Sequence, residues 1–329
     1  MQAFKYVAPN TLQEALSLLS PTWGETDILA GGTDLLSLMK QGVHKPKQVV
    51  SLKNIKDLSR IDRVDGGLLI GAKVTLHQVV DNIPVRVEYP AVTHAAEGVK
   101  GVQMRAMGTV GGDLLQRPRC WYFRNGFSLL ARDANGNPMV PNGENQYHAI
   151  LGNKGPAYFV NASSLAPALI ALRAKVRIAS ASGEREFDIE QLYRSPTADS
   201  ERELTLKANE ILTHIFIPPT AGTRSATYEV RKRQMLDWPL ATASVSLTMK
   251  GETVESASIA LGHVAPIPWR SREAEQALVN RVVTEDVALA AGDAAVARAM
   301  PLSRNTYKVQ LARIAVKRAI LAAAGKTSI

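Results

Sequence analysis

Residues 29–36, LAGGTDLL, place two adjacent glycines between a short apolar segment and an amphipathic one. A second glycine pair follows at residues 109–114, TVGGDL. Because glycine has no Cβ, consecutive glycines let backbone N–H groups approach a bound oxygen anion closely, and a helix start adds a favourable dipole. A tight bend is the simpler explanation of each pair taken alone. Two such turns in one chain favour a grip on a diphosphate from both sides.

Neither turn matches the established nucleotide-binding motifs. The dinucleotide fingerprint GxGxxG and the phosphate loop GxxxxGK[ST] are both missing from these stretches. The pattern therefore predicts a nucleotide-binding fold of another kind.

The composition is that of a folded globular protein of two or three domains. The 329 residues are 46% hydrophobic and 21% charged. The single cysteine, Cys120, and the dispersed histidines lack metal-ligand spacing, so no metal site is expected in this chain. The net charge of +9 is dispersed along the chain, which argues against nucleic-acid binding.

The N-terminal residues show no export signal, and no stretch has the apolar length of a membrane span. We expect no membrane insertion and a cytoplasmic location. The alternative is the periplasm, reached as a folded subunit bound to a partner that carries the signal.

The first third of the chain predicts a compact β-turn-α-β unit. Thr11 to Glu14 form a capping box before a helix. Residues 28–30 and 48–52 predict strands, with a turn at 31–33 and a helix at 34–41 between them. A strand and helical segments follow, and then a polar stretch over 116–155 that is expected to be an exposed excursion, functional or partly disordered.

The remainder predicts a second group of strands and a separate C-terminal domain. A helix is expected at 166–172, with strands at KVRIAS, REFDI and ILTHIFIP, and a linker at 218–222. Three further strands, ATYEV, ATASVSLTM and ESASIALG, precede amphipathic helices. The expected domains are residues 1–55, 56–220 with the long loop 116–155, and 224–329.

Four stretches, in this order, resemble one known family. They are LAGGTDLLSLMK, MGTVGGDLLQRPRCWYFR, SSLAPALIAL and LGHVAPIPWRSREAE. Together they resemble the FAD-binding medium subunit of molybdenum hydroxylases, which include bacterial xanthine dehydrogenase, aldehyde oxidoreductase and carbon monoxide dehydrogenase. The resemblance implies an α+β protein. Its expected fold is a vanillyl-alcohol-oxidase-like (PCMH-type) FAD-binding fold of two subdomains, followed by a smaller C-terminal α+β domain.

The resemblance also implies residues that contact FAD. The first pyrophosphate loop would comprise Leu29, Ala30, Gly31, Gly32, Thr33, Asp34 and Leu35. The second would comprise Thr109, Gly111, Gly112 and Asp113, and single contacts would come from Ser164 and Arg231.

Three of these positions depart from the family pattern. Asp113 stands where the family usually has asparagine, and an ionised carboxylate there would repel phosphate. Ser164 replaces an aspartate near the flavin side chain and retains a hydroxyl for hydrogen bonding. Arg231 is expected to replace a displaced lysine, although residues 228–233 read equally well as a strand with a solvated basic face.

The run RCWYFR resembles relatives whose medium subunit holds an additional four-iron cluster on four cysteines. Only Cys120 is present, so no cluster is expected and Cys120 is predicted to be a packed thiol. The alternating arginines and aromatic residues of 116–124 could stack on RNA, but a subunit interface is the favoured interpretation.

The implied function is electron transfer through FAD. Electrons would arrive from 2Fe-2S clusters in a small partner and leave for an external acceptor. The substrate would be oxidised in a large molybdopterin subunit, so no catalytic residue is expected in this chain. The alternatives are a stand-alone flavin-dependent oxidase and a basic RNA-binding or scaffold protein.

Overall fold

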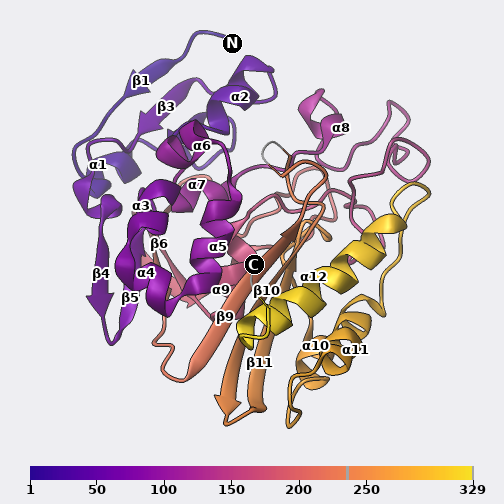
Figure 1. Cartoon of the computed structure of the whole chain (residues 1–329). Helices are drawn as coiled ribbons and strands as arrows, with labels where there is room; N and C mark the ends of the chain where they lie inside the picture. Colours follow the sequence, from indigo (N-terminus) through magenta and orange to yellow (C-terminus); the bar gives the residue numbers. More distant parts are fainter. Residues whose placement is uncertain (235–236, 328–329) are drawn as a thin grey trace.

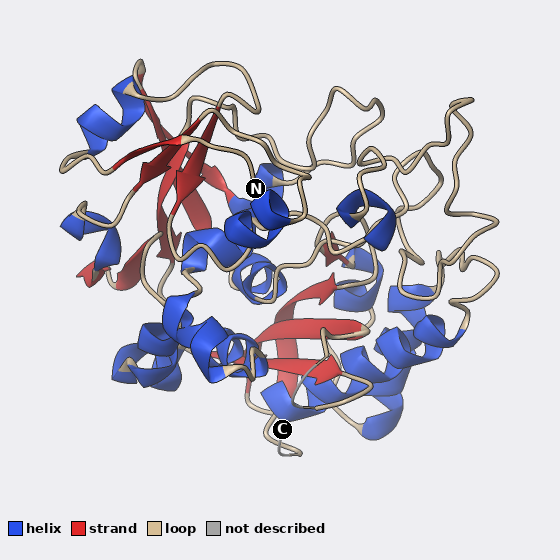
Figure 2. Ribbon diagram, turned by 90° about the horizontal axis from the view of Figure 1, so that it is seen from above, coloured by secondary structure: helices blue, strands red, loops and turns tan. Residues whose placement is uncertain are grey.

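The structure is a computed structural model that describes residues 1–234 and 237–327, and its strands form three sheets (Figures 1 and 2). The N-terminal sheet and its helices lie at the opposite end of the molecule from the C-terminal helices in Figure 1. The expected C-terminal domain includes Met235, Leu236 and residues 328–329, which lie outside the described residues.

The first sheet is parallel, with strand order β1-β3-β2. Its elements are β1 (Lys5–Val7), α1 (Leu12–Ser17), β2 (Thr26–Leu29), α2 (Leu35–Lys40) and β3 (Gln48–Ser51). The predicted capping box is confirmed, because Thr11 Oγ1 accepts from the Glu14 amide at 3.1 Å and the Glu14 carboxylate accepts from the Thr11 amide. The predicted β-turn-α-β unit is confirmed as β2-α2-β3, with the first glycine pair between β2 and α2.

The second sheet is antiparallel, with strand order β4-β5-β8-β6-β7. Its strands are β4 (Ile61–Val64), β5 (Gly67–Gly71), β6 (Lys175–Ser180), β7 (Gly183–Asp188) and β8 (Ile211–Ile217), with short 3-10 helices η1 (Lys56–Ser59) and η2 (Ile189–Leu192). The helices of this region are α3 (Leu76–Asp81), α4 (Ile83–Glu88), α5 (Pro90–Gly98), α6 (Val102–Met107), α7 (Val110–Leu115) and α9 (Leu165–Ala171). One apolar core joins the sheet to α3, α5, α7 and α9.

The third sheet is antiparallel, with strand order β12-β11-β10-β9, and forms a second core with the C-terminal helices. Its elements are β9 (Thr223–Val230), β10 (Ala241–Lys250), β11 (Thr253–Gly262), β12 (Trp269–Arg270), α10 (Arg272–Gln276), α11 (Glu285–Val296) and α12 (Tyr307–Ala323). The three strands predicted beyond the linker are confirmed.

This third sheet lies between α12 and α5 because side chains alternate along β9. The Ser225 hydroxyl accepts from the Ala91 amide of α5, and the Thr227 hydroxyl donates to the Ala91 carbonyl at 2.9 Å. On the other face, the Tyr228 hydroxyl accepts from Arg318 of α12. Figure 1 shows α12 crossing in front of the strands. Both faces are therefore covered, which explains the small residues of β10.

The stretch 116–155 is only in part the exposed excursion expected from its composition: residues 134–138 are exposed, whereas other segments are buried. It contains one short helix, α8 (Trp121–Arg124), and otherwise irregular backbone. Leu129, Leu130 and Ile150 are nonetheless buried. Asn145 is fully buried, and its amide donates to the carbonyls of Val140 and Pro141 and to the Ser303 hydroxyl. The buried side chain of Asn145 thus serves as an internal partner of the backbone, whereas Asn135 and Asn137 of the same stretch are exposed.

Within the described part of the chain, no helix combines the length and the apolar character needed to cross a bilayer.

Candidate cofactor-binding site

The two glycine turns meet at one cleft of about 190 Å³ between the first and second sheets. Ala30 to Leu35 form one wall, and Thr109, Gly111 and Gly112 contribute to another. Cationic side chains from three other segments also line the cleft: Lys73, Arg117 and Arg202. The fold therefore brings together both turns, which are distant in sequence.

The first glycine turn presents backbone donors that the chain does not use. Among the hydrogen bonds of residues 1–234 and 237–327, none has the N–H of Gly31, Gly32, Thr33 or Asp34 as its donor. Backbone N–H groups without a partner are rare in folded proteins unless water or a ligand accepts from them. Four consecutive free N–H groups beside a cleft suit an anion with several oxygens.

The second glycine pair differs from the turn expected from the sequence, because Gly111 and Gly112 lie in the first turn of α7. Its donors are already used: the Gly111 N–H donates to the Ala72 carbonyl at 2.8 Å, and the Gly112 N–H donates to Thr109 Oγ1 at 3.0 Å. The amides of Val110 and Asp113 are bonded in the same way within the chain. The fold therefore does not present two equivalent sets of free amides to a diphosphate.

Packing explains why position 31 is glycine. A Cβ added to Gly31 would lie 1.7 Å from the carbonyl oxygen of Met107, the last residue of α6. No side chain fits there without moving the backbone. The bare turn thus has a structural cause, close contact with α6, in addition to its free amides.

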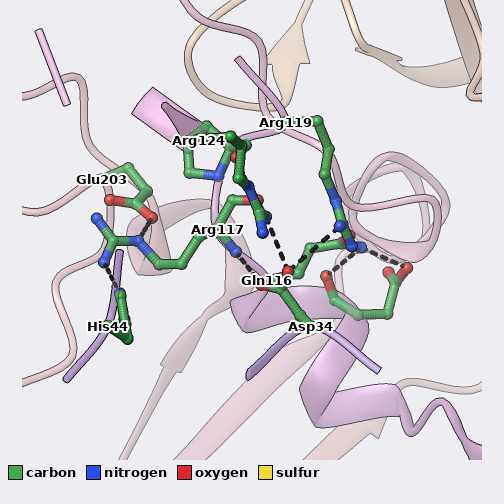
Figure 3. A network of polar contacts seen from close by, with 9 residues as sticks. Asp34, His44, Gln116, Arg117, Arg119, Arg124 and Glu203 are labelled. Carbon is green, nitrogen blue, oxygen red and sulfur yellow. Dashed lines mark hydrogen bonds and ion pairs between the residues drawn. The ribbon is translucent and has the colours of Figure 1, made fainter. Parts of the chain in front are cut away.

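Asp34 connects the first turn to the start of the long stretch, as Figure 3 shows. Its carboxylate accepts from the Arg117 amide at 2.8 Å and from Arg124 Nη2 at 2.8 Å, and it pairs with Arg119 at 3.3 Å. The Asp34 carboxylate is therefore occupied by arginines, and its role in the site is to hold the turn against residues 117–124.

A second buried network continues from Arg117 (Figure 3). Arg117 Nε donates to Glu203 at 2.5 Å, and its Nη1 lies 3.0 Å from His44 Nε2. Because a guanidinium only donates, His44 Nε2 accepts and its Nδ1 carries the proton donated to Asp27 at 3.1 Å. Sequence reasoning missed this network, since its members lie in four separate segments.

Four predicted residues are not among those lining the cleft: Leu29, Asp113, Ser164 and Arg231. Asp113 is buried, and its carboxylate accepts from the Ser163 hydroxyl at 2.5 Å and from the amides of Ser164 and Leu165. Burial raises the pKa of Asp113, against the opposing effect of these hydrogen bonds. The carboxylate joins α7 to the start of α9 and does not line the cleft.

Ser164 and Arg231 likewise face the interior. Ser164 is 1% exposed. The Arg231 guanidinium pairs with Glu229 and donates to the Asp237 carbonyl. Arg231 therefore neutralises the buried carboxylate of Glu229 in β9, so the solvated basic face considered for 228–233 does not apply to this side chain.

Cys120 lies against His148, with 3.2 Å between Sγ and Nε2, and burial raises the pKa of its thiol. Among the described residues, no group of three or more histidine, cysteine, aspartate or glutamate side chains is arranged to hold a metal ion.

Family comparison completes the description of the site. Residues 2–220 match the model of the FAD binding domain in molybdopterin dehydrogenase, and residues 226–323 match the CO dehydrogenase flavoprotein C-terminal domain. The chain belongs to this family of FAD-binding molybdopterin dehydrogenase subunits.

Individual relatives of this FAD-binding subunit align with it in sequence over nearly the whole chain. The aldehyde oxidoreductase FAD-binding subunit PaoB of Escherichia coli is 29% identical, over 95% of this chain and 96% of that protein. The carbon monoxide dehydrogenase medium chain of Hydrogenophaga pseudoflava is 27% identical, over 97% and 96%.

Solved structures give the same result for the fold. A structure of carbon monoxide dehydrogenase from Hydrogenophaga pseudoflava matches with a TM-score of 0.77 and 26% identity, over 99% of both chains. Quinoline 2-oxidoreductase from Pseudomonas putida matches with a TM-score of 0.76 and 26% identity, over 99% of both. The predicted α+β fold, an FAD-binding part followed by a C-terminal domain, is confirmed, and the FAD-binding subunit is an oxidoreductase subunit as predicted.

Proposed function

We propose that this chain carries FAD in a heteromeric molybdenum hydroxylase and relays electrons within it. A small partner with 2Fe-2S clusters would supply the electrons, a large molybdopterin subunit would oxidise the substrate, and an external acceptor would remove the electrons. The observation that carries the proposal is the run of four unpartnered N–H groups from Gly31 to Asp34 in a family of FAD-binding domains.

The donor set of the cleft fits a dinucleotide. The free amides of Gly31 to Asp34 would hold the pyrophosphate, and Arg202 would contribute positive charge at the same cleft, whereas the charge of Arg117 is paired with Glu203. The Arg202 guanidinium lies over the Trp23 ring at 4.0 Å, so its planar face is held in place. Gly111 and Gly112 would contribute space rather than donors. The bound flavin supplies the redox chemistry, and the chain supplies binding and electrostatics.

The surface beside the first glycine turn supports association with partner chains. Helix α6 has no buried residue, and its Val102, Met104 and Met107 side chains are 69%, 39% and 55% exposed. Exposed apolar surface of this kind is typical of protein interfaces. A redox partner docked there would lie next to the proposed pyrophosphate site.

The test is the flavin content of the purified chain and of a matched pair of variants at Thr33. Thr33→Glu adds a carboxylate beside the proposed pyrophosphate, whereas Thr33→Gln adds the same bulk without charge. We expect FAD in the wild type and in Thr33→Gln, and an affinity at least about tenfold lower in Thr33→Glu. Equal FAD content in the two variants would contradict the assignment.

The same preparations separate the two alternatives. A stand-alone oxidase would oxidise an aldehyde or heterocycle without companion chains, whereas the proposed subunit requires its partners. A scaffold or RNA-binding protein would release no flavin on extraction.

A further inference from the structure

A second cavity, of about 420 Å³, borders the glycine cleft and shares five lining residues with it: Trp23, Asp27, His44, Arg117 and Arg202. Its other walls come from Gly24, from residues 43 and 45, from residues 123, 128 and 129 of the long stretch, and from residues 199–201. Among the described residues, none of either glycine turn lines it. Its volume lies within the range of about 300–1,000 Å³ that is typical of small-molecule sites. The cavity is therefore large enough for a ligand of its own.

Arg202 lines this cavity as a cation without an ion-pair partner. In residues 1–234 and 237–327, no carboxylate pairs with the Arg202 guanidinium and no acceptor takes a hydrogen bond from it. The guanidinium stacks over the Trp23 ring at 4.0 Å, which fixes its plane. Burial lowers the pKa of Arg202 to about 10, and the Arg117 charge adds to this effect. Because its plane is fixed and its donors are free, Arg202 is arranged to bind an oxyanion through two parallel hydrogen bonds.

Arg117 lines the same cavity and shows the contrast. Its guanidinium lies over the Phe123 ring at 4.9 Å. Its Nε donates to Glu203 at 2.5 Å, and its Nη1 donates to His44, as Figure 3 shows. Of these two stacked guanidinium groups, Arg202 is thus the one that is available to a ligand.

Three carboxylates also line the cavity, and each has a partner other than Arg202. Asp27 accepts from His44 at 3.1 Å. Asp199 pairs with Arg132 at 3.4 Å. The carboxylate of residue 201 accepts from the amide of residue 197 at 2.7 Å. These acids therefore leave the Arg202 donors free for an incoming oxyanion.

Two further donors and an apolar wall complete the cavity. The Ser128 hydroxyl oxygen is buried and has no partner in the described part of the chain. Buried polar atoms of folded proteins nearly always have a partner, so this hydroxyl is suited to a ligand. Lys45 is exposed at the same cavity and forms no ion pair with a described carboxylate. Val43 and Leu129 supply apolar surface. Convergent donors beside apolar side chains are typical of sites for small organic ligands.

We propose that this cavity binds a small organic oxyanion, an alkyl carboxylate or an alkyl phosphate. Its charged group would contact Arg202 and Ser128, and its apolar part would lie against Val43 and Leu129. A guanidinium fork fits carboxylate and phosphate equally, so the structure defines their shared chemistry. The ligand is additional to FAD, and the inference does not rest on the proposed function.

Calorimetry of the FAD-loaded chain tests the site with butyrate and butyl phosphate as probes and uncharged butyramide as the reference. At least one of the two anions should bind at least about tenfold more tightly than butyramide, and the tighter one identifies the oxyanion. Flavin absorbance should show that FAD stays bound. The FAD-free chain is titrated in parallel, so that a failure of FAD binding leaves this test intact.

Two results of these titrations would overturn the proposal. One is equal affinity for both anions and the amide, because the free guanidinium would then select no charge. The other is release of FAD in proportion to probe binding, because the cavity would then be part of the flavin site.

Variants locate the binding. Arg202→Gln removes the guanidinium and should weaken binding of the tighter anion at least about tenfold. Ser128→Ala removes the buried hydroxyl without a change of charge and should weaken it about tenfold. Lys45→Gln should weaken it about threefold, whereas Lys40→Gln is the matched control, since Lys40 is an exposed lysine of α2 that does not line the cavity. Unchanged binding in Arg202→Gln and Ser128→Ala, or equal weakening by the two lysine variants, would refute the assignment.

Discussion

Asp34 shows how a single side chain can be essential to a site without facing the ligand. Its carboxylate holds the first glycine turn against Arg117, Arg119 and Arg124. The Arg124 side chain is 9% exposed, so its charge depends on this partner. Asp34 thus affects the cleft indirectly, because it fixes the position of the backbone of the first glycine turn.

We predict that Asp34→Asn lowers the free energy of unfolding by about 3 kcal/mol, because it leaves a buried guanidinium without its carboxylate. FAD affinity should fall with it, since the turn loses its anchor. Denaturant titration measures the first effect and calorimetry the second.

The control is Asp62→Asn in the exposed Arg60–Asp62 pair, where both side chains are more than two-fifths exposed. Its effect should stay within about 0.5 kcal/mol. A similar loss of unfolding free energy in both variants would show that the buried Asp34 network stabilises the protein no more than an exposed ion pair does.

At the level of elements, local sequence signals predicted most of the fold near the cleft. The capping box at Thr11, the helix after Asp34 and the strands β6 and β8 follow from periodicity and cap residues over short ranges. The glycine pair at 111–112 was predicted less well. Glycines weaken a helix, so the sequence predicts a turn at this pair. In the structure, the Thr109 cap and the carbonyls that accept from the first amides of α7 stabilise the helix there.

Thr109 is therefore expected to fix the position at which α7 begins. Thr109→Ala removes the acceptor of the Gly112 N–H and should cost about 1 kcal/mol, whereas Thr109→Ser keeps the hydroxyl and most of the stability. Thermal unfolding of the two variants compares them directly. Equal melting temperatures would mean that the cap contributes nothing.

On the scale of the whole molecule, the contacts beside the glycine cleft and around the buried Lys308 are long-range. His44, Arg117 and Glu203 meet from three distant segments, and Lys308 reaches carbonyls at 147, 148 and 263. Neither periodicity nor residue spacing predicts these long-range contacts, because each residue is of an ordinary type for its own stretch of sequence. Within 116–155, the polar character of Asn145 was misleading for a similar reason, because its amide donates to buried backbone carbonyls and not to solvent.

The proposed binding of FAD depends on which backbone amides contact the cofactor, and hydrogen exchange with and without FAD measures this most directly. In the FAD-free chain, the amides of Gly31 to Asp34 should exchange rapidly, while those of residues 110–113 are already protected by their internal bonds. Saturation with FAD should slow exchange at 31–34 about tenfold or more. Unchanged exchange at 31–34 in the FAD-saturated chain would contradict the account.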